Sequence, residues 1–204
     1  MKHDDSKSID DYIELLKVSM KSFDCTIFKQ NFEICIISSK VDFIKIVHFI
    51  KDHPSTNFTL LVDLCAVDYP DNKKRFEIVY NFLSISQNMR LRLKLEVEDN
   101  ETVESISNIY PCSNWYEREI WDLFGISFTN HPDLRRLLTD YNFEGHPLRK
   151  DFPLTGFVQV RYDDEKKQVI NEPVKLDQEY RNFENLSPWE GIISDLPGDE
   201  KKSV

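Results

Sequence analysis

Hydrophobic residues along the first half of the chain follow helical and strand-like spacing in turn. Ile9, Ile13, Leu16 and Met20 recur at the interval of one helix face, which predicts a helix at the start. Residues 25–38 alternate between apolar and polar side chains, which predicts one strand. Similar patterns predict a helix over residues 41–51, strands over 58–70, 75–85 and 89–97, and a helix over 101–110.

A further helix, over residues 114–125, has well-marked ends. Asn114 can cap its start, and Glu117, three residues later, fits the partner position of a capping box. Gly125 stands where a left-handed residue ends many helices. Arg118 and Asp122 are four residues apart, so they are expected to pair on the helix surface.

The order of these elements predicts an α+β fold. We expect a compact mixed sheet with helices on one face, followed by an extended C-terminal arm. Three parts are expected: an α+β domain over 1–128 that includes the helix 114–125, a Pro/Arg-rich docking segment over 129–156, and a hairpin with an extended partner-binding arm over 157–204.

The arm is the least regular part of the chain. Residues 157–170 read as a small hairpin, but residues 171–204 show no sustained helical or strand period. Single apolar residues such as Trp189 are widely spaced there and cannot build a core. The segment is therefore either a disordered tail or an arm whose apolar residues contact another protein.

Charge and hydropathy restrict the partners and the compartment. The 204 residues include 36 acids and 26 bases, a formal net charge of -10, which argues against nucleic acid or an anionic membrane surface as the main partner. No apolar run approaches the roughly 20 residues that span a bilayer. The first residues resemble neither a signal peptide nor a transit peptide, so we expect the chain to work in the compartment where it is made.

Cysteine and glycine usage argues against bound cofactors. The four cysteines, at 25, 35, 65 and 112, lack the close spacing of zinc or iron–sulfur ligands and are expected to be reduced. The five glycines are too scattered for a phosphate-binding or dinucleotide-binding loop. NAD, FMN or ATP binding by a familiar loop is therefore not expected.

Residues 117–151 contain the chemistry that remains to be explained. Acids, two histidines and several arginines could form an acid–base or metal site, or a charged docking surface. Glu117 and Glu119 point about 200° apart on a helix, so they cannot share a substrate. Arginine pairs well with carboxylates at interfaces, which favours docking. The candidate docking residues are Glu117, Arg118, Glu119, Asp122, His131, Arg135, Arg136, His146, Arg149, Lys150, Asp151 and Trp189.

Three stretches in this region carry a family resemblance. NWYEREIWDLFGI (114–126), NHPDLRRLLTDY (130–141) and FEGHPLRKDFPL (143–154) resemble the 30-kDa subunit of respiratory complex I, the proton-pumping NADH:quinone oxidoreductase. The family signature is met by Glu117-Arg118-Glu119, Asp122, Leu123-Phe124, His131, Arg135 and Leu137-Leu138. Ser113 replaces an expected alanine, and Asn142 a frequent glycine. The resemblance covers nearly the whole chain and is strongest over 114–191.

The resemblance implies a subunit without catalytic residues and without a cofactor of its own. Such a subunit belongs to the peripheral arm that carries electrons from NADH through FMN and Fe-S clusters, held in partner subunits, towards quinone. Its main partner would be the 49-kDa subunit, over which its C-terminal arm runs. It would not be a homo-oligomer, and it would meet the membrane only through the complex.

The sequence leaves alternatives open for both the cellular location and the function. The expected location is the cytoplasmic side of a bacterial inner membrane, with the matrix face of a mitochondrion as the alternative. The same ancestry also admits the equivalent subunit of a membrane-bound hydrogenase-type complex. A free-standing acid–base or metal hydrolase built on Glu117, His131 and His146 is a third hypothesis.

Overall fold

The computed structural model describes residues 5–176, and the chain divides into two compact units, residues 1–156 and 157–204. The elements are α1 (Asp5–Ser19), β1 (Cys25–Gln30), β2 (Glu33–Ser38), α2 (Phe43–Asp52), β3 (Leu60–Asp68), β4 (Phe76–Ser84), β5 (Met89–Val97), β6 (Val103–Glu104), α3 (Ser113–Phe124), β7 (Phe128–Thr129), β8 (Val158–Asp163) and β9 (Gln168–Pro173).

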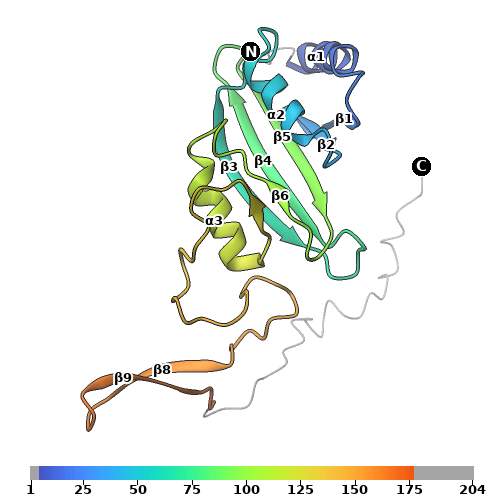
Figure 1. The fold of residues 1–204 in the computed structure, drawn as a ribbon. Helices are drawn as coiled ribbons and strands as arrows, with labels where there is room; N and C mark the ends of the chain where they lie inside the picture. The colour runs from blue at the N-terminus through green and yellow to red at the C-terminus, as the bar shows by residue number, and fades with distance from the viewer. Residues whose placement is uncertain (1–4, 177–204) are drawn as a thin grey trace, which may run out of the picture. The chain divides into compact units, whose positions relative to one another are not determined.

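The first unit is built on a five-stranded mixed sheet with the order β1-β2-β5-β4-β3 (Figure 1). Strands β2 and β5 are parallel, with Ile36 opposite Leu93, and the other neighbours are antiparallel. The strand order places β5 in the middle of the sheet and β1 and β3 at its two edges. The mixed sheet confirms the predicted α+β class.

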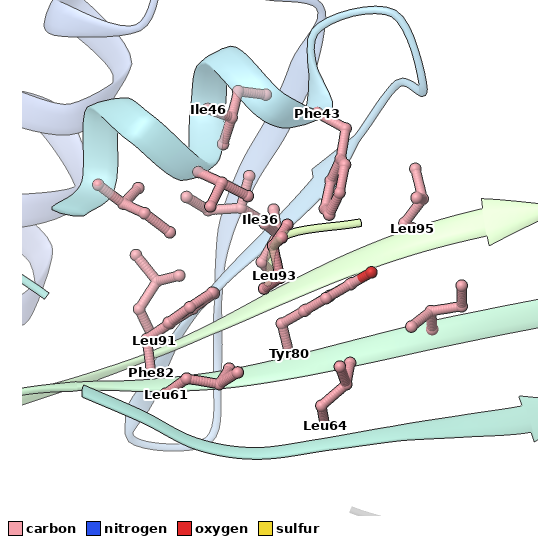
Figure 2. Packing of buried hydrophobic residues seen from close by; sticks show 14 of the residues in the cluster. Ile36, Phe43, Ile46, Leu61, Leu64, Tyr80, Phe82, Leu91, Leu93 and Leu95 are labelled. Carbon is pink, nitrogen blue, oxygen red and sulfur yellow. The ribbon is translucent and has the colours of Figure 1, made fainter. Parts of the chain in front are cut away.

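One face of the sheet forms the core. Leu91, Leu93, Leu95 and Val97 alternate along β5 and are almost fully buried, as the period-two pattern predicts. Figure 2 shows residues of α2 packing onto this face. Residues of α1 and α3 join the same hydrophobic cluster, so all three helices contribute to one core.

Along β5 the opposite face is charged and carries cross-strand ion pairs. Arg92 lies 2.8 Å from Glu33, and Lys94 lies 3.0 Å from Glu77. Opposite charges on neighbouring strands favour this register, and the Lys94 and Glu77 side chains are only 18% and 17% exposed. The alternation along β5 therefore separates an apolar core face from a charged face.

The segment predicted as one strand over residues 25–38 is a hairpin, so that prediction was wrong. Strands β1 and β2 are joined at Asn31 and Phe32, and Asn31 has a φ of 56°. Asparagine tolerates this left-handed conformation, which suits a tight hairpin turn. Phe32 lies in this turn, and its side chain is 81% exposed.

The helix predicted over residues 101–110 is also absent. Val103 is instead paired with Phe128 in the short parallel ladder of β6 and β7. Val103 also donates its backbone N–H to the Ser127 carbonyl. Burial of Val103 and Ile106 in the core holds this segment extended, which overrides its helical spacing.

The described part of the second unit is a two-stranded ribbon. Strands β8 and β9 pair antiparallel, with Val160 opposite Asn171, which confirms the predicted hairpin. The Arg161 Nε lies 3.2 Å from Glu172 Oε1 on one face of the ribbon. Residues 177–204, which include most of the expected arm and Trp189, lie outside the described residues.

Candidate functional site

Helix α3 carries the first half of the candidate region and lies against edge strand β3 (Figure 1). The Tyr116 hydroxyl donates a hydrogen bond of 3.3 Å to the Val62 carbonyl of β3. Gly125 ends the helix with a φ of 80°, and its N–H donates to the Trp121 carbonyl, which confirms the predicted C-cap.

The predicted capping box at the start of α3 was wrong. The N-cap position is Cys112, in a helical conformation, and no side chain there bonds the helix N-terminus. Glu117 turns into the protein instead of back toward the start of the helix. Its Oε2 accepts a 2.5 Å bond from the Ser105 hydroxyl, and its Oε1 accepts a 2.8 Å bond from the Ile106 N–H.

Glu117 is a buried carboxyl group with an altered acidity. Its side chain has 0% exposure, and burial raises its pKa above the ordinary value. The bonds from Ser105 and Ile106 favour the charged form and oppose that shift, but burial has the larger effect. The carboxyl group therefore joins α3 to the extended segment that carries β6.

His131 is equally buried, and backbone groups satisfy both of its ring nitrogens. Nδ1 accepts a 3.1 Å bond from the Asp133 N–H, so the proton of the neutral ring lies on Nε2. Nε2 donates to the Asn114 carbonyl at 3.0 Å and lies 3.9 Å from Glu117 Oε2. Neither nitrogen is left free to bind a metal or to move a substrate proton.

Asp122 organises the loop that follows the helix. Its Oδ2 accepts the backbone N–H groups of Leu137, Leu138 and Thr139 at 3.0, 2.7 and 2.9 Å. Its Oδ1 accepts the Thr139 hydroxyl at 2.5 Å and Arg136 Nη1 at 2.8 Å. Burial alone would raise the pKa of Asp122, but these donors outweigh burial and hold it well below its usual range.

The arginines of this region bind the backbone of their own chain. Arg118 was expected to pair with Asp122, but it donates to the Arg135 carbonyl at 3.2 Å and the Arg136 carbonyl at 3.0 Å. Arg136 takes the Asp122 partnership and also donates to the Phe143 carbonyl at 2.7 Å. The loop conformation is therefore fixed by charge-assisted bonds within the chain.

Residues 146–149, in the second half of the charged region 117–151, cover the C-terminal end of α3. His146 Nδ1 bonds the Asp122 carbonyl at 2.9 Å, and the Leu148 N–H donates to the Leu123 carbonyl at 3.0 Å. Arg149 Nε donates to the Phe124 carbonyl at 2.6 Å. These donors satisfy carbonyls that a helix end leaves unpaired, and the arginine complements the negative end of the helix dipole.

A second group of ion pairs and hydrogen bonds holds residues 150–151 against the end of β3. Arg75 lies 2.7 Å from Asp68 and 2.9 Å from Asp151, and Asp68 also accepts the Lys150 N–H at 2.7 Å. Burial opposes the shift, but Arg75 holds the pKa of Asp68 below its usual value. Asp68 and Arg75 were not among the predicted site residues. The available signal was an acid at the end of a largely apolar strand segment.

The candidate docking residues divide into two groups in the structure. The group that is bonded within the chain comprises Glu117, Arg118, Asp122, His131, Arg136, His146, Arg149 and Asp151. Glu119 is half-buried, Lys150 is exposed, and Arg135 is exposed beside Asp133 at 2.9 Å. Trp189 lies outside the described residues.

Within residues 5–176, no group of three or more His, Cys, Asp or Glu side chains could hold a metal ion. No helix in the same range is both long and apolar enough to cross a bilayer. The hydrogen bonds described above hold the charged region from Glu117 to Asp151 against α3 and the end of β3.

Comparison with known families identifies the family of the chain. Residues 36–158, more than half of the chain, match the family described as "Respiratory-chain NADH dehydrogenase, 30 Kd subunit". The chain belongs to this family. The matched range contains α3 and the whole ordered segment that follows it.

Members of the 30-kDa subunit family resemble the chain over most of its length. A protein of Xanthobacter autotrophicus is 56% identical over 171 residues, which cover 84% of this chain and 82% of the relative. A protein of Ruegeria pomeroyi is 53% identical over 181 residues, covering 89% and 88%. Both relatives are named as a subunit of NADH-quinone oxidoreductase.

A solved structure shares the fold of this family member. It is a chain from the membrane-bound sulfane sulfur reductase, described as an archaeal respiratory membrane complex, with a TM-score of 0.63. The match covers 80% of this chain and 99% of that chain, at 19% sequence identity. At this identity the likeness establishes the fold alone.

Proposed function

We propose that this chain is a cofactor-free docking subunit in the peripheral arm of a proton-translocating NADH:quinone oxidoreductase. Its family and the names of its relatives support this role. In that role the chain supports electron transfer from NADH to quinone while FMN and Fe-S clusters reside in partner subunits.

The observation that carries the non-catalytic part of the proposal is the bonding of Asp122. Its two oxygens accept five hydrogen bonds from groups of its own chain. A general base needs an oxygen within hydrogen-bond reach of a substrate proton, and a lowered pKa weakens a carboxylate as a base. The same residue is well suited to hold a surface loop in one conformation.

The proposed partners are other subunits of the complex, chiefly the 49-kDa subunit. The proposed location is the cytoplasmic side of the bacterial inner membrane, with membrane contact only through the complex. The outward-facing docking residues, Glu119, Arg135 and Lys150, would meet the partner, while the bonded group keeps the surface in shape.

Two other functions are less well supported. The fold is shared with a chain of an archaeal respiratory membrane complex, so a subunit of a related complex is the second candidate. A free-standing hydrolase built on Glu117, His131 and His146 is disfavoured because hydrogen bonds within the chain occupy the Glu117 carboxylate, both ring nitrogens of His131 and His146 Nδ1.

The test is replacement of Arg135 in the intact complex. The Arg135–Asp133 pair is exposed and contributes about 0–1 kcal/mol to the free subunit, whereas a charge pair broken at an interface costs about 2–5 kcal/mol. Arg135→Ala should therefore weaken assembly by roughly 30-fold at the smaller interface cost, and by more at the larger cost, with near-normal turnover per assembled complex.

The measurement is NADH:quinone activity divided by assembled complex on a native gel. Lys17→Ala is the matched control, because Lys17 also forms an exposed ion pair, with Glu14 at 2.8 Å on α1. Full assembly of the Arg135 variant with turnover per complex reduced a hundredfold would favour a catalytic role instead.

A further inference from the structure

An open apolar groove lies between α3 and the loop that follows the Arg135–Arg136 pair. It has a volume of about 630 Å³ and is lined by Cys112, Trp115, Tyr116, Glu119, Leu137 and Leu138. Trp115 is 67% exposed and Leu138 is 62% exposed. Large apolar side chains gathered on a surface indicate a binding site more often than scattered ones do.

The two walls of the groove are held in place by hydrogen bonds. Asp122 accepts the N–H groups of Leu137 and Leu138, which fixes one wall relative to the helix. On the other wall, the Tyr116 hydroxyl is bonded to the Val62 carbonyl. A groove that is already ordered in the free subunit avoids part of the entropy cost of binding.

The charged side chain in the lining of the groove is an acid. Glu119 lines it and forms no ion pair with any residue of 5–176, and the same is true of exposed Asp63 on adjacent strand β3. Partial burial raises the pKa of the Cys65 thiol, the carboxylates of Asp63 and Glu119 add to that increase, and Arg92 opposes it. A ligand that placed a cation here would satisfy acids that have no partner within the described chain.

We propose that this groove receives a segment of a neighbouring subunit that carries an aliphatic or aromatic anchor beside a lysine or arginine. The anchor would contact Trp115 and Leu138, and the cation would pair with Glu119. Tryptophan residues at the centre of interfaces often contribute a large share of the binding free energy. The proposal rests on the proposed function, since it needs an assembled complex.

The test compares two groove variants with two controls in the intact complex, purified through a tag on this chain. Trp115→Ala and Glu119→Lys should each lower the flavin and iron recovered per tagged chain by about tenfold or more. Phe32→Ala, which removes another exposed aromatic ring, and Asp71→Lys, which reverses another exposed acid, should leave recovery unchanged.

Thermal unfolding of each isolated variant shows whether its fold is intact. Equal recovery for the folded groove variants and wild type would overturn the groove proposal alone. Absence of flavin and iron from wild-type preparations would instead overturn the proposed function. The two failures are therefore distinguishable.

Alkylation of Cys112 provides a second readout that needs no change at the groove's apolar residues. Cys112 lines the groove and is exposed, so in a Cys65→Ser background it should react with a maleimide in the free subunit and be protected in the complex. Reaction at equal rates in both states would contradict the proposal.

Protection in the free subunit would also contradict it and would identify another occupant. If deletion of residues 177–204 restored the reaction, the chain's own C-terminal segment would be the occupant. If dilution restored it, the occupant would be a second copy of the chain.

Discussion

Two carboxyl groups on α3, five residues apart, have pKa shifts of opposite sign. Glu117 is buried and accepts hydrogen bonds from two uncharged donors, of Ser105 and Ile106, and burial raises its pKa. Asp122 is also buried, but five donors that include a guanidinium lower its pKa. The number and charge of hydrogen-bond donors decide the sign, because burial acts in the same direction on both.

Replacement of Asp122 should be among the most destabilising changes in the chain. Asp122→Asn removes the charge that pairs with Arg136 and places an amide beside three N–H donors, which should cost about 3–5 kcal/mol. For a unit of this size we expect a decrease in Tm of roughly 10 °C. Asp133→Asn is the control, because the Asp133–Arg135 pair is exposed. Calorimetry showing equal Tm values for both variants would contradict this role.

The raised pKa of Glu117 predicts that the stability of the protein depends on pH. Between its unfolded pKa of about 4.5 and its higher folded pKa, the native state binds more protons than the unfolded state. The contribution of this carboxyl group to stability therefore falls as pH rises between the two values. Wild type should therefore lose stability relative to Glu117→Gln between pH 4.5 and the raised pKa. Urea unfolding across this range measures the difference. Exposed Glu104→Gln should track wild type, and a parallel Glu117→Gln curve would contradict the prediction.

At the scale of elements, the C-terminal end of α3 is the junction between the helix and the charged segment. Three successive carbonyls, of residues 122–124, receive donors from His146, Leu148 and Arg149. Gly125 permits this approach, since a Cβ there would lie 2.6 Å from the His146 ring and 2.8 Å from Arg149 Nη2. Helix and segment are therefore expected to unfold together.

Gly125→Ala tests that close packing. Both Gly125 and Gly156 have positive φ values, of 80° and 68°, but a Cβ at Gly156 would meet nothing within 4 Å. Gly156→Ala should therefore show only the backbone cost, about 1 kcal/mol. Gly125→Ala should cost clearly more, because His146 and Arg149 must move. Equal losses in free energy of unfolding would show that the junction is loosely packed.

The sequence predicted elements well where local pattern and tertiary packing agree. The alternation of β5 and the glycine at the end of α3 are local signals, and both were confirmed. The helix over 101–110 was wrong because backbone pairing of β6 with β7 and the inward turn of Glu117 involve residues distant in sequence. The charged residues of segment 117–151 were predicted to dock a partner, but the hydrogen bonds among them within the chain could not be derived from spacing.

For the whole molecule, the two units differ in how much apolar surface they bury. The core cluster is formed entirely by residues before Thr129, and the ribbon of β8 and β9 leaves Val158, Val160, Tyr162 and Val169 more than half exposed. An isolated two-stranded hairpin is marginally stable in water. The stability of the chain should therefore reside in the first unit.

Truncation after Gly156 separates folding from assembly. Residues 1–156 retain the sheet, its core and the bonded segment on α3, so their Tm should lie within a few degrees of that of the full chain. If the second unit carries the proposed partner-binding arm, the truncated chain should fold but be recovered without flavin and iron. The measurements are calorimetry on the isolated chain and cofactor content after tagged purification. A truncated chain that assembles as well as the full chain would show that docking depends on the first unit alone, through surfaces such as the groove beside Trp115.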